Sequence, residues 1–218
     1  MIYNIYPTKD ATVYSYSASM NTGNDQILEI EKTIPVEGGA KSKARTIIQF
    51  DWESAYTELL TLPGDFATSF ASASFDSSLK LHTTEVKNIP YTYKIEAIRT
   101  NATWEMGIGK RHHTPITEKG VSWGFRTASG SDAWSTAGVG ITAGANIQTQ
   151  SFEFESTDID INISESVASW QENSSNNTGL LLRLTSSQEE DTLEYGQLKF
   201  FSRDTNTIYS PKLQIGWD

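Results

Sequence analysis

The sequence predicts an all-β protein, an antiparallel jelly-roll β-sandwich with one or two short helices. Apolar and polar residues alternate with a period of two in many segments, which is typical of strands because successive side chains point to opposite faces. Hydrophobic residues make up 37% of the chain, a share that fits sheets with one face in water. Only one segment combines helical periodicity with a capping pattern. We therefore expect a helix content below about a fifth, under the usual third.

The predicted strands are recognised by apolar residues two positions apart. These sets are Ala11 and Val13, Leu28 and Ile30, Ile48 and Phe50, Leu79 and Leu81, Tyr91, Tyr93 and Ile95, Phe152 and Phe154, Ile159, Ile161 and Ile163, and Leu213, Ile215 and Trp217. The segment Leu180–Leu184 differs, because it is apolar apart from Arg183. Such a run predicts a central strand that is covered on both faces.

One helix is predicted between Asn162 and Gly179. Asn162 can cap it, and Glu165 stands three residues later, which gives a capping-box pattern. One face of this helix collects the apolar residues Ile163, Val167 and Trp170. Because so short a helix is marginal alone, burial of this face must hold it against the sandwich.

A second short helix is predicted near Ser54–Leu60, with Ser54 as its cap. Two stretches without alternation, Gly107–Gly120 and Ala128–Gly144, are rich in small residues and are predicted to be loops. Long ordered loops on a β scaffold are where contacts are usually made. No internal repeat or linker divides the chain, so we expect residues 1–218 to form a single domain.

The charge balance excludes several classes of function. The chain has 27 acidic residues against 17 Lys and Arg, which gives a net charge of −10. It lacks a basic stripe, so nucleic-acid binding is not expected. Without cysteines it has neither disulfides nor a thiolate nucleophile. It shows no secretory-signal pattern and no apolar stretch near the ~20 residues that span a bilayer. We expect synthesis in a cytoplasm and no membrane contact.

Seven short motifs occur in order along the chain. They are Asp10–Val13 with Asn21–Gly23, Arg45–Asp51, Ser78–Leu81, Trp104–Glu105 with Val121–Trp123, Asp160–Val167 with Trp170, Gly179–Arg183, and Phe200–Asp204 with Pro211–Leu213. Together they resemble the DNRLRE-type domains, jelly-roll β-sandwiches related to carbohydrate-binding modules. The resemblance covers nearly the whole chain. It departs from the family in a longer loop between Trp104 and Trp123 and in the insert Ala128–Gly144.

The resemblance implies that Trp104, Trp123 and Trp170 belong to the framework of the fold. Trp134 lies instead in a loop of small residues. An exposed tryptophan there would suit a sugar ring or a protein partner, whereas a buried one would pin the loop to the sandwich.

Three tyrosines are further contact candidates, namely Tyr3, Tyr14 and Tyr16. Tyr14 and Tyr16 are opposite in phase to Val13, so they are expected to point outward. Flat aromatic faces on a sheet form either a sugar platform or an interface, and the alternative is cross-strand packing on a solvated sheet.

Metal binding has few candidates. Asp158 and Asp160 share a strand face and could contribute to a calcium site together with backbone carbonyls. The run Glu189–Asp191 offers a similar set of oxygens. The pair His112–His113 lacks neighbouring ligands, so a solvated loop is expected there. No cofactor is predicted, with calcium as the one open alternative.

We find no nucleophile elbow, phosphate loop or zinc-protease motif, and no singled-out carboxylate pair of the glycosidase kind. The chain is therefore expected not to be an enzyme.

The first hypothesis for its function is a multicopy structural protein of a virus particle: a head decoration, neck, collar or tail component of a tailed bacteriophage. Such a structural protein would bind other virion proteins through its loops and its apolar first residues. The alternative is a carbohydrate-binding module or adhesin that recognises a polysaccharide or cell surface.

Overall fold

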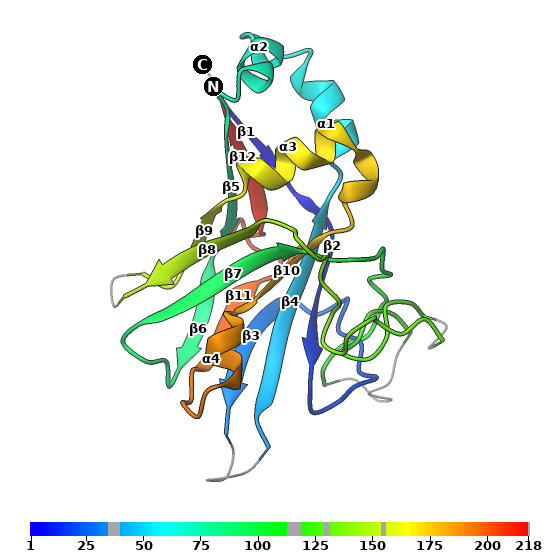
Figure 1. Ribbon diagram of the computed structural model, residues 1–218, viewed down its shortest axis with the longest axis vertical. Helices are drawn as coiled ribbons and strands as arrows, with labels where there is room; N and C mark the ends of the chain where they lie inside the picture. The colour runs from blue at the N-terminus through cyan, green and yellow to red at the C-terminus, as the bar shows by residue number, and fades with distance from the viewer. Residues whose placement is uncertain (35–39, 113–118, 129–130, 154–155, 218) are drawn as a thin grey trace.

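Two antiparallel sheets pack face to face in the computed structural model, which describes residues 1–34, 40–112, 119–128, 131–153 and 156–217 (Figure 1). The small sheet has the order β1 (Ile2–Ile5), β12 (Lys212–Gly216), β5 (Asp76–Leu81) and β9 (Ile159–Asn162). The large sheet has the order β6 (Thr83–Lys87), β11 (Gly196–Phe201), β3 (Ile27–Thr33), β4 (Ser42–Phe50), β10 (Leu180–Leu184), β7 (Tyr93–Arg99) and β8 (Ile147–Phe152), with β2 (Pro7–Tyr14) paired to β4. Strands make up 38% and helices 15% of the described residues. The predicted jelly-roll β-sandwich with low helix content is confirmed.

The main core lies between the two sheets. The small sheet contributes Leu79, Leu81, Ile159, Ile161, Leu213 and Ile215, and the large sheet contributes Leu28, Ile30, Ile48, Ile95, Leu180 and Leu182. These are the apolar sides of the alternating patterns, because a strand that is covered on one face buries every second residue.

A second, smaller core lies on the outer face of the large sheet. The chain between β7 and β8 returns across this face and packs Trp104, Trp134 and Val139 against strand residues. The strand residues beneath it are Ala11, Val13, Ile47 and Leu181. Strand β10 is therefore buried on both faces, as the run Leu180–Leu184 predicted.

Asn21 fastens part of this covering segment to the sandwich. Its buried side-chain amide donates to the carbonyl oxygens of Met106, at 2.7 Å, and Val121, at 2.8 Å. Its Oδ1 accepts from the Gly109 N–H at 2.8 Å. Gly107 passes so close, at φ +77°, that an added Cβ would lie 2.4 Å from Asn21 Oδ1. The described part of the segment is therefore a packed layer rather than a free arm.

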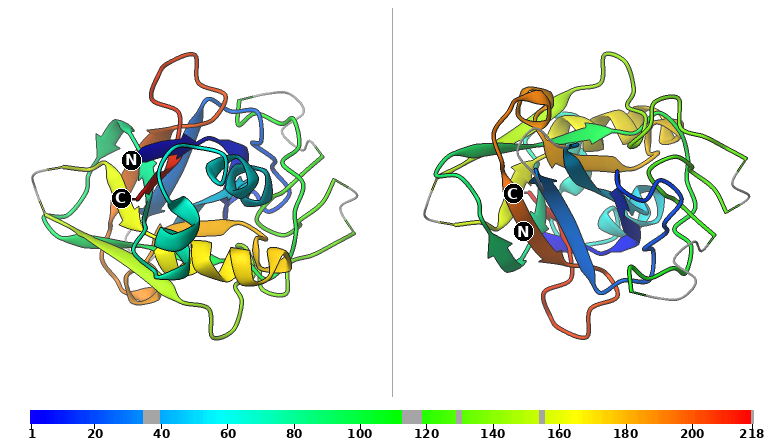
Figure 2. Two further views of the ribbon diagram at one scale, coloured as in Figure 1. Left: turned by 90° about the horizontal axis from the view of Figure 1, so that it is seen from above. Right: turned by 90° about the horizontal axis from the view of Figure 1, so that it is seen from below.

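Three of the four described α-helices cover one end of the sandwich, beside which Met1 and Trp217 lie (Figure 2). They are α1 (Trp52–Leu59), α2 (Phe66–Ala71) and α3 (Ser164–Glu172), which is followed by a 3₁₀ turn, η1 (Ser174–Asn176); α4 (Ser186–Glu190) lies against the large sheet. Helix α1 matches the second predicted helix. Its cap is Asp51 rather than Ser54, because the Asp51 carboxylate accepts from the Ser54 N–H at 3.1 Å.

The predicted apolar face of α3 is confirmed, since Ile163, Val167 and Trp170 are all buried. The predicted capping box is wrong. Asn162 is the last residue of β9, and the N-cap position is taken by Ile163. Asn162 still accepts a hydrogen bond from the Ser164 N–H at 3.0 Å. Its side chain therefore stabilises the first turn of α3 from the residue before the N-cap.

Asp10 makes the stability of the fold depend on pH. Burial raises the pKa of Asp10 to about 7, although its carboxylate accepts a hydrogen bond from the Arg203 N–H at 2.7 Å. The native state therefore holds a proton that the unfolded chain, with a pKa near 3.8, has already released. The contribution of Asp10 to the free energy of unfolding is fully present below the pKa of the carboxyl in the unfolded chain. This contribution is lost as the pH rises toward the pKa in the folded state.

We expect Asp10→Asn to stabilise the protein by up to ~4 kcal/mol at about pH 8, at ~1.4 kcal/mol per unit of pKa, and by little near pH 4. Asparagine retains an acceptor for the Arg203 N–H. Urea denaturation of both proteins at the two pH values tests this expectation. A pH-independent difference between them would show that Asp10 is already ionised in the folded state.

Candidate functional site

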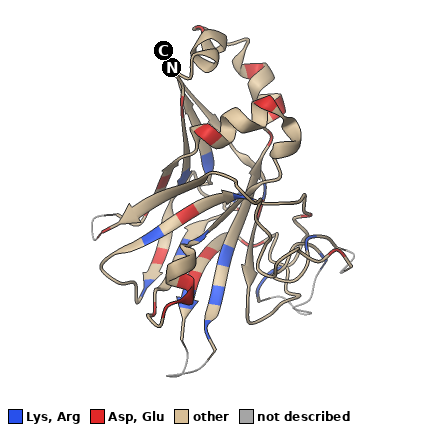
Figure 3. Ribbon diagram, viewed as in Figure 1, with Lys and Arg blue, Asp and Glu red and all other residues tan. Residues whose placement is uncertain are grey.

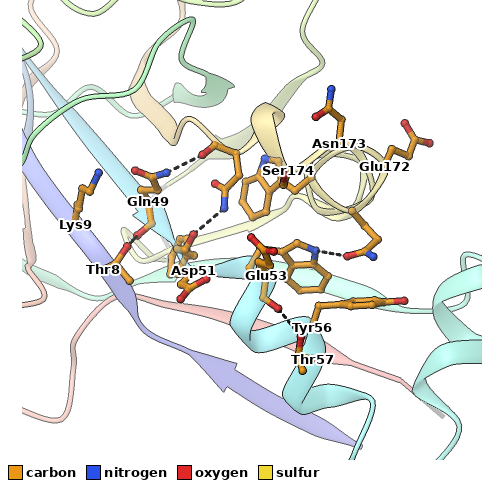
Figure 4. A pocket seen from close by; sticks show the side chains of 15 residues that line it. Thr8, Lys9, Gln49, Asp51, Glu53, Tyr56, Thr57, Glu172, Asn173 and Ser174 are labelled. Atoms are coloured by element: carbon orange, nitrogen blue, oxygen red, sulfur yellow. Dashed lines mark hydrogen bonds between the residues drawn. The ribbon is translucent and has the colours of Figure 1, made fainter.

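A polar groove opens at the helical end of the sandwich, between α1, the last turn of α3 and the strands β2 and β4 (Figure 4). Its volume is about 730 Å³, within the usual range of ligand sites. Thr8, Glu53 and Thr57 form one part of its exposed rim, and Glu172 and Asn173 form another. The groove combines residues that lie far apart in the sequence.

Two tryptophans give the groove rigid walls. Trp52, on α1, and Trp170, on α3, are both only 2% exposed. The Trp52 Nε1–H donates to Gln171 Oε1 at 3.1 Å, which ties the two helices together across the groove. The Trp52 ring also lies 5.8 Å from the ring of Tyr56. Because the aromatic rings already pack against one another, the polar side chains at the rim are held in place before any ligand binds.

Several hydrogen-bonding groups in the groove are unsatisfied. Gln49 donates through Nε2 to the Asn177 carbonyl oxygen at 2.7 Å, and Asn177 donates through Nδ2 to the Phe50 carbonyl oxygen at 2.8 Å. Each amide thus uses its nitrogen on the backbone. Gln49 Oε1, Asn177 Oδ1 and Trp170 Nε1 are buried and have no partner among the described residues. These atoms are almost inaccessible to solvent, and each costs about 1–3 kcal/mol while it has no partner. A ligand that reaches them after a small movement of the groove side chains would therefore bind favourably.

The rim is acidic. Asp51, Glu53 and Glu172 are exposed, and Lys9 is the one basic residue among the described residues that line the groove. Lys9 donates from Nζ to the Trp104 carbonyl oxygen at 3.0 Å. Burial lowers the pKa of Lys9, and the charge of Glu105 partly opposes this shift. The Lys9 ammonium group therefore interacts mainly with groups of the sandwich and does little to offset the acidic rim of the groove.

The candidate Trp134 is not exposed. It is 5% accessible, it packs in the second core, and its Nε1–H donates to the Ser122 carbonyl oxygen at 3.1 Å. Of the two alternatives that the sequence left open, the buried residue that pins its loop is the one that the structure shows. Trp134 pins the described part of Ala128–Gly144 to the sheet. Trp104 and Trp170 are core residues, as predicted, and Trp123 is half-buried beside the second core.

Tyr14 and Tyr16 do not form an outward pair. Tyr14 is 1% exposed, whereas Tyr16 is 52% exposed, and their ring centroids are 5.3 Å apart. The Arg111 guanidinium lies 4.8 Å from the Tyr14 ring and 5.9 Å from the Tyr16 ring, and it also forms an ion pair with Glu29 at 2.6 Å. The expectation for Tyr14 is wrong because Arg111 covers the face of β2 that was expected to meet water.

Tyr3 is half-buried in β1 and packs against the main core. A hydrogen bond with Glu58, together with burial, raises the pKa of Tyr3. Tyr3 therefore packs partly against the protein and leaves only part of its surface for a contact.

The proposed calcium ligands are bound to protein groups. Asp160 forms an ion pair with Lys80 at 2.7 Å. Asp158 accepts from the Thr83 N–H at 2.7 Å and lies 3.1 Å from His82 Nδ1. Burial alone would raise the pKa of Asp158, but these hydrogen bonds lower it overall. Among the described residues, no group of three or more His, Asp or Glu side chains is arranged to hold a metal ion.

The remaining candidates lie elsewhere. In the run Glu189–Asp191, Glu189 and Asp191 pair with Arg45 and Lys32 respectively. His112 is exposed, while His113 lies outside the described residues. No helix in the described ranges is long and apolar enough to cross a membrane. None of these features adds a residue to the groove.

No protein-family model matches the chain, and no curated protein matches it. The resemblance to the DNRLRE-type domains therefore stays a prediction. The groove must be interpreted from its own chemistry.

Proposed function

We propose that this protein is a non-enzymatic binding protein and that the groove holds a carbohydrate chain. The observation that supports this most is the unsatisfied set of Gln49 Oε1, Asn177 Oδ1 and Trp170 Nε1. Two acceptors and one donor match sugar hydroxyls, which both donate and accept. The exposed polar rim supplies further partners, and the preformed walls reduce the entropy that binding costs.

We further propose that the protein works in multiple copies on a virus particle, as a head decoration, neck, collar or tail component of a tailed bacteriophage. A cysteine-free β-sandwich with a net charge of −10 suits such a part. A virion protein can also bind host glycans, so the two proposals are compatible. Other virion proteins would be its structural partners.

Strand β1 is the surface that best suits attachment to such a partner. It is a terminal strand of the small sheet, and its other side pairs with no strand in the described part of the chain. The Trp217 N–H donates to the Met1 carbonyl oxygen at 3.1 Å. Because hydrogen-bonded pairs alternate, the backbone groups of Ile2 and Asn4 face the free edge. Ile2 is 70% exposed and Tyr6 is 58% exposed.

The covering loops suit attachment less well than the sequence suggested, because Asn21 and Trp134 fasten their described parts.

We expect Ile2→Lys to lower the number of copies per purified particle severalfold, since a charge on a free edge opposes strand pairing. Stability should change by less than about 0.5 kcal/mol. Ile208→Lys, at an 88% exposed position in the connection between β11 and β12 rather than on β1, is the matched control. Equal incorporation of both variants would exclude β1 as the attachment edge.

The groove is tested by Gln49→Met, which retains the length of the side chain and removes its amide. We expect about 3- to 10-fold weaker binding of neutral oligosaccharides, the effect of one lost hydrogen bond. Binding is measured by calorimetry with ligands selected from a panel of neutral glycans.

Gln150→Met is the matched control for Gln49→Met. Gln150, on β8, bridges the backbone of Asp158 and Asp160 and does not line the groove. Denaturant midpoints show what each substitution does to folding. If both variants bind equally well, the groove is not the site. If neither neutral nor amine-bearing glycans bind the wild type, the proposed carbohydrate function is wrong.

A further inference from the structure

We infer that the groove selects sugars by charge: it favours chains that bear protonated amines over neutral ones, and it rejects chains that bear carboxylate or sulfate groups. This inference rests on the proposed carbohydrate function and names the ligand class that the same groove would take.

The first observation is the sign of the charges around the groove. Helices α1 and α3 contain acidic residues and no Lys or Arg (Figure 3). Asp51 and Glu53 lie at the start of α1, and Glu172 lies at the end of α3. All three are exposed at the rim. A ligand amine placed between the two helices would therefore meet carboxylates from both sides.

The second observation is the direction of α3. Its last residues, together with Asn173, line the groove, so the carbonyl end of the helix lies at this site. A helix carries partial negative charge at this end, and basic residues there usually offset it. The last turn of α3 contains no basic residue. The N-terminal end of α1, which carries the opposite partial charge, also lies at the groove, but the Asp51 carboxylate caps it. The C-terminal end of α3 is therefore the less balanced of the two helix ends.

The third observation is the lack of an anion partner. Carboxylate and sulfate groups are typically recognised by a guanidinium fork, and no arginine is present among the described residues that line the groove. Lys9, their one cation, is bound to the Trp104 carbonyl oxygen and is also close enough to Glu105 to be influenced by its charge. An anionic sugar would lose hydration without gaining a counter-charge.

The acidic rim coincides with an independent sign of a ligand site. Trp170 is 2% exposed, yet its Nε1 has no partner among the described residues. A carboxylate rim alone is common on a protein with a net charge of −10. Together with a buried donor and two unsatisfied amide oxygens, it marks a groove that is prepared for a polar, uncharged or positively charged ligand.

The experiment compares three oligomers of equal length by calorimetry at mildly acidic pH: a glucosamine oligomer, its N-acetylated form and a galacturonate oligomer. We expect the amine oligomer to bind about 3- to 10-fold tighter than the N-acetylated one, as one or two exposed ion pairs allow. The galacturonate oligomer should bind most weakly. Added salt should remove most of the difference between the amine and N-acetylated forms.

The double variant Glu53→Gln and Glu172→Gln removes rim charges and retains both side-chain shapes. We expect it to abolish the amine preference while leaving the affinity for the N-acetylated oligomer within about 2-fold. Glu165→Gln, on the same helix but outside the groove, is the matched control and should preserve the preference.

The outcomes separate the two proposals. Equal binding of the amine and galacturonate oligomers would overturn the charge selection while the carbohydrate function stands. A preference that survives the double variant would place its origin elsewhere and also overturn the inference. If none of the three oligomers binds and no neutral glycan binds either, both the charge selection and the proposed carbohydrate function are wrong.

Discussion

Replacement of Glu189 by alanine is expected to destabilise the fold by ~3–5 kcal/mol, the usual effect of breaking a buried ion pair. Glu189 lies on α4 with its side chain 3% exposed, and it forms an ion pair with Arg45. Arg183 lies 3.8 Å away and binds Glu96 at 2.8 Å. Removing one carboxylate leaves buried guanidinium charge without its counter-charge. Chemical denaturation measures the loss.

Glu190 provides the control at the next position. Its side chain is 71% exposed and pairs with Lys43 at the surface. Glu190→Ala should cost less than about 1 kcal/mol, as exposed pairs do. If the two alanine variants lose equal stability, the charge network beneath α4 is not the reason for the effect.

Trp170→Ala is expected to destabilise the protein by ~3–5 kcal/mol, as large-to-small changes in a core do. Trp170 is the largest member of the buried face that holds α3 against the sandwich. The same substitution removes a wall of the groove, so glycan binding should be lost together with stability.

Trp170→Phe separates these two effects. Phenylalanine fills most of the space, so it should cost less stability than alanine, but it lacks the Nε1–H that has no partner among the described residues. We expect weakened glycan binding in a folded protein. A denaturant midpoint of Trp170→Ala equal to that of the wild type would show that the α3 face is not an anchor.

The sequence predicted the strands well because alternation reports burial on one face directly. Leu180–Leu184 predicted a doubly covered strand, and Ile163, Val167 and Trp170 predicted the buried face of α3. Each of these patterns lies within one element. Local periodicity is sufficient for such predictions, because it depends only on which side of the element meets the core.

The same reasoning failed where a distant segment covers an expected solvent face. Tyr14 alternates correctly with Val13, but Arg111 covers it, while the second core buries the opposite face of β2. Trp134 has no periodic neighbours, so nothing local distinguishes a pinned residue from an exposed one. The error for Tyr14 and the open alternative for Trp134 both come from tertiary covering, which a period-two pattern does not encode.

The groove was missed for a related reason. Gln49 and Asn177 are 128 residues apart and are joined by a single hydrogen bond. In the sequence, Gln49 is only the polar position of a strand, and Asn177 belongs to a polar run that ends a helix. The pairing of β10 with β4, in which Leu180 lies opposite Ile48, brings them together, and no local spacing rule expresses that contact.

The central claim is that this groove binds carbohydrate, and the indole N–H signal of Trp170 tests it most directly. Nitrogen-15-labelled protein would be titrated with the tightest-binding neutral oligosaccharide, and the indole signals would be assigned with Trp170→Phe. We predict that the Trp170 indole signal and the side-chain amide signals of Gln49 and Asn177 shift together and saturate at one affinity. Saturable shifts that leave these three signals unchanged and cluster elsewhere would contradict the assignment of the groove as the binding site.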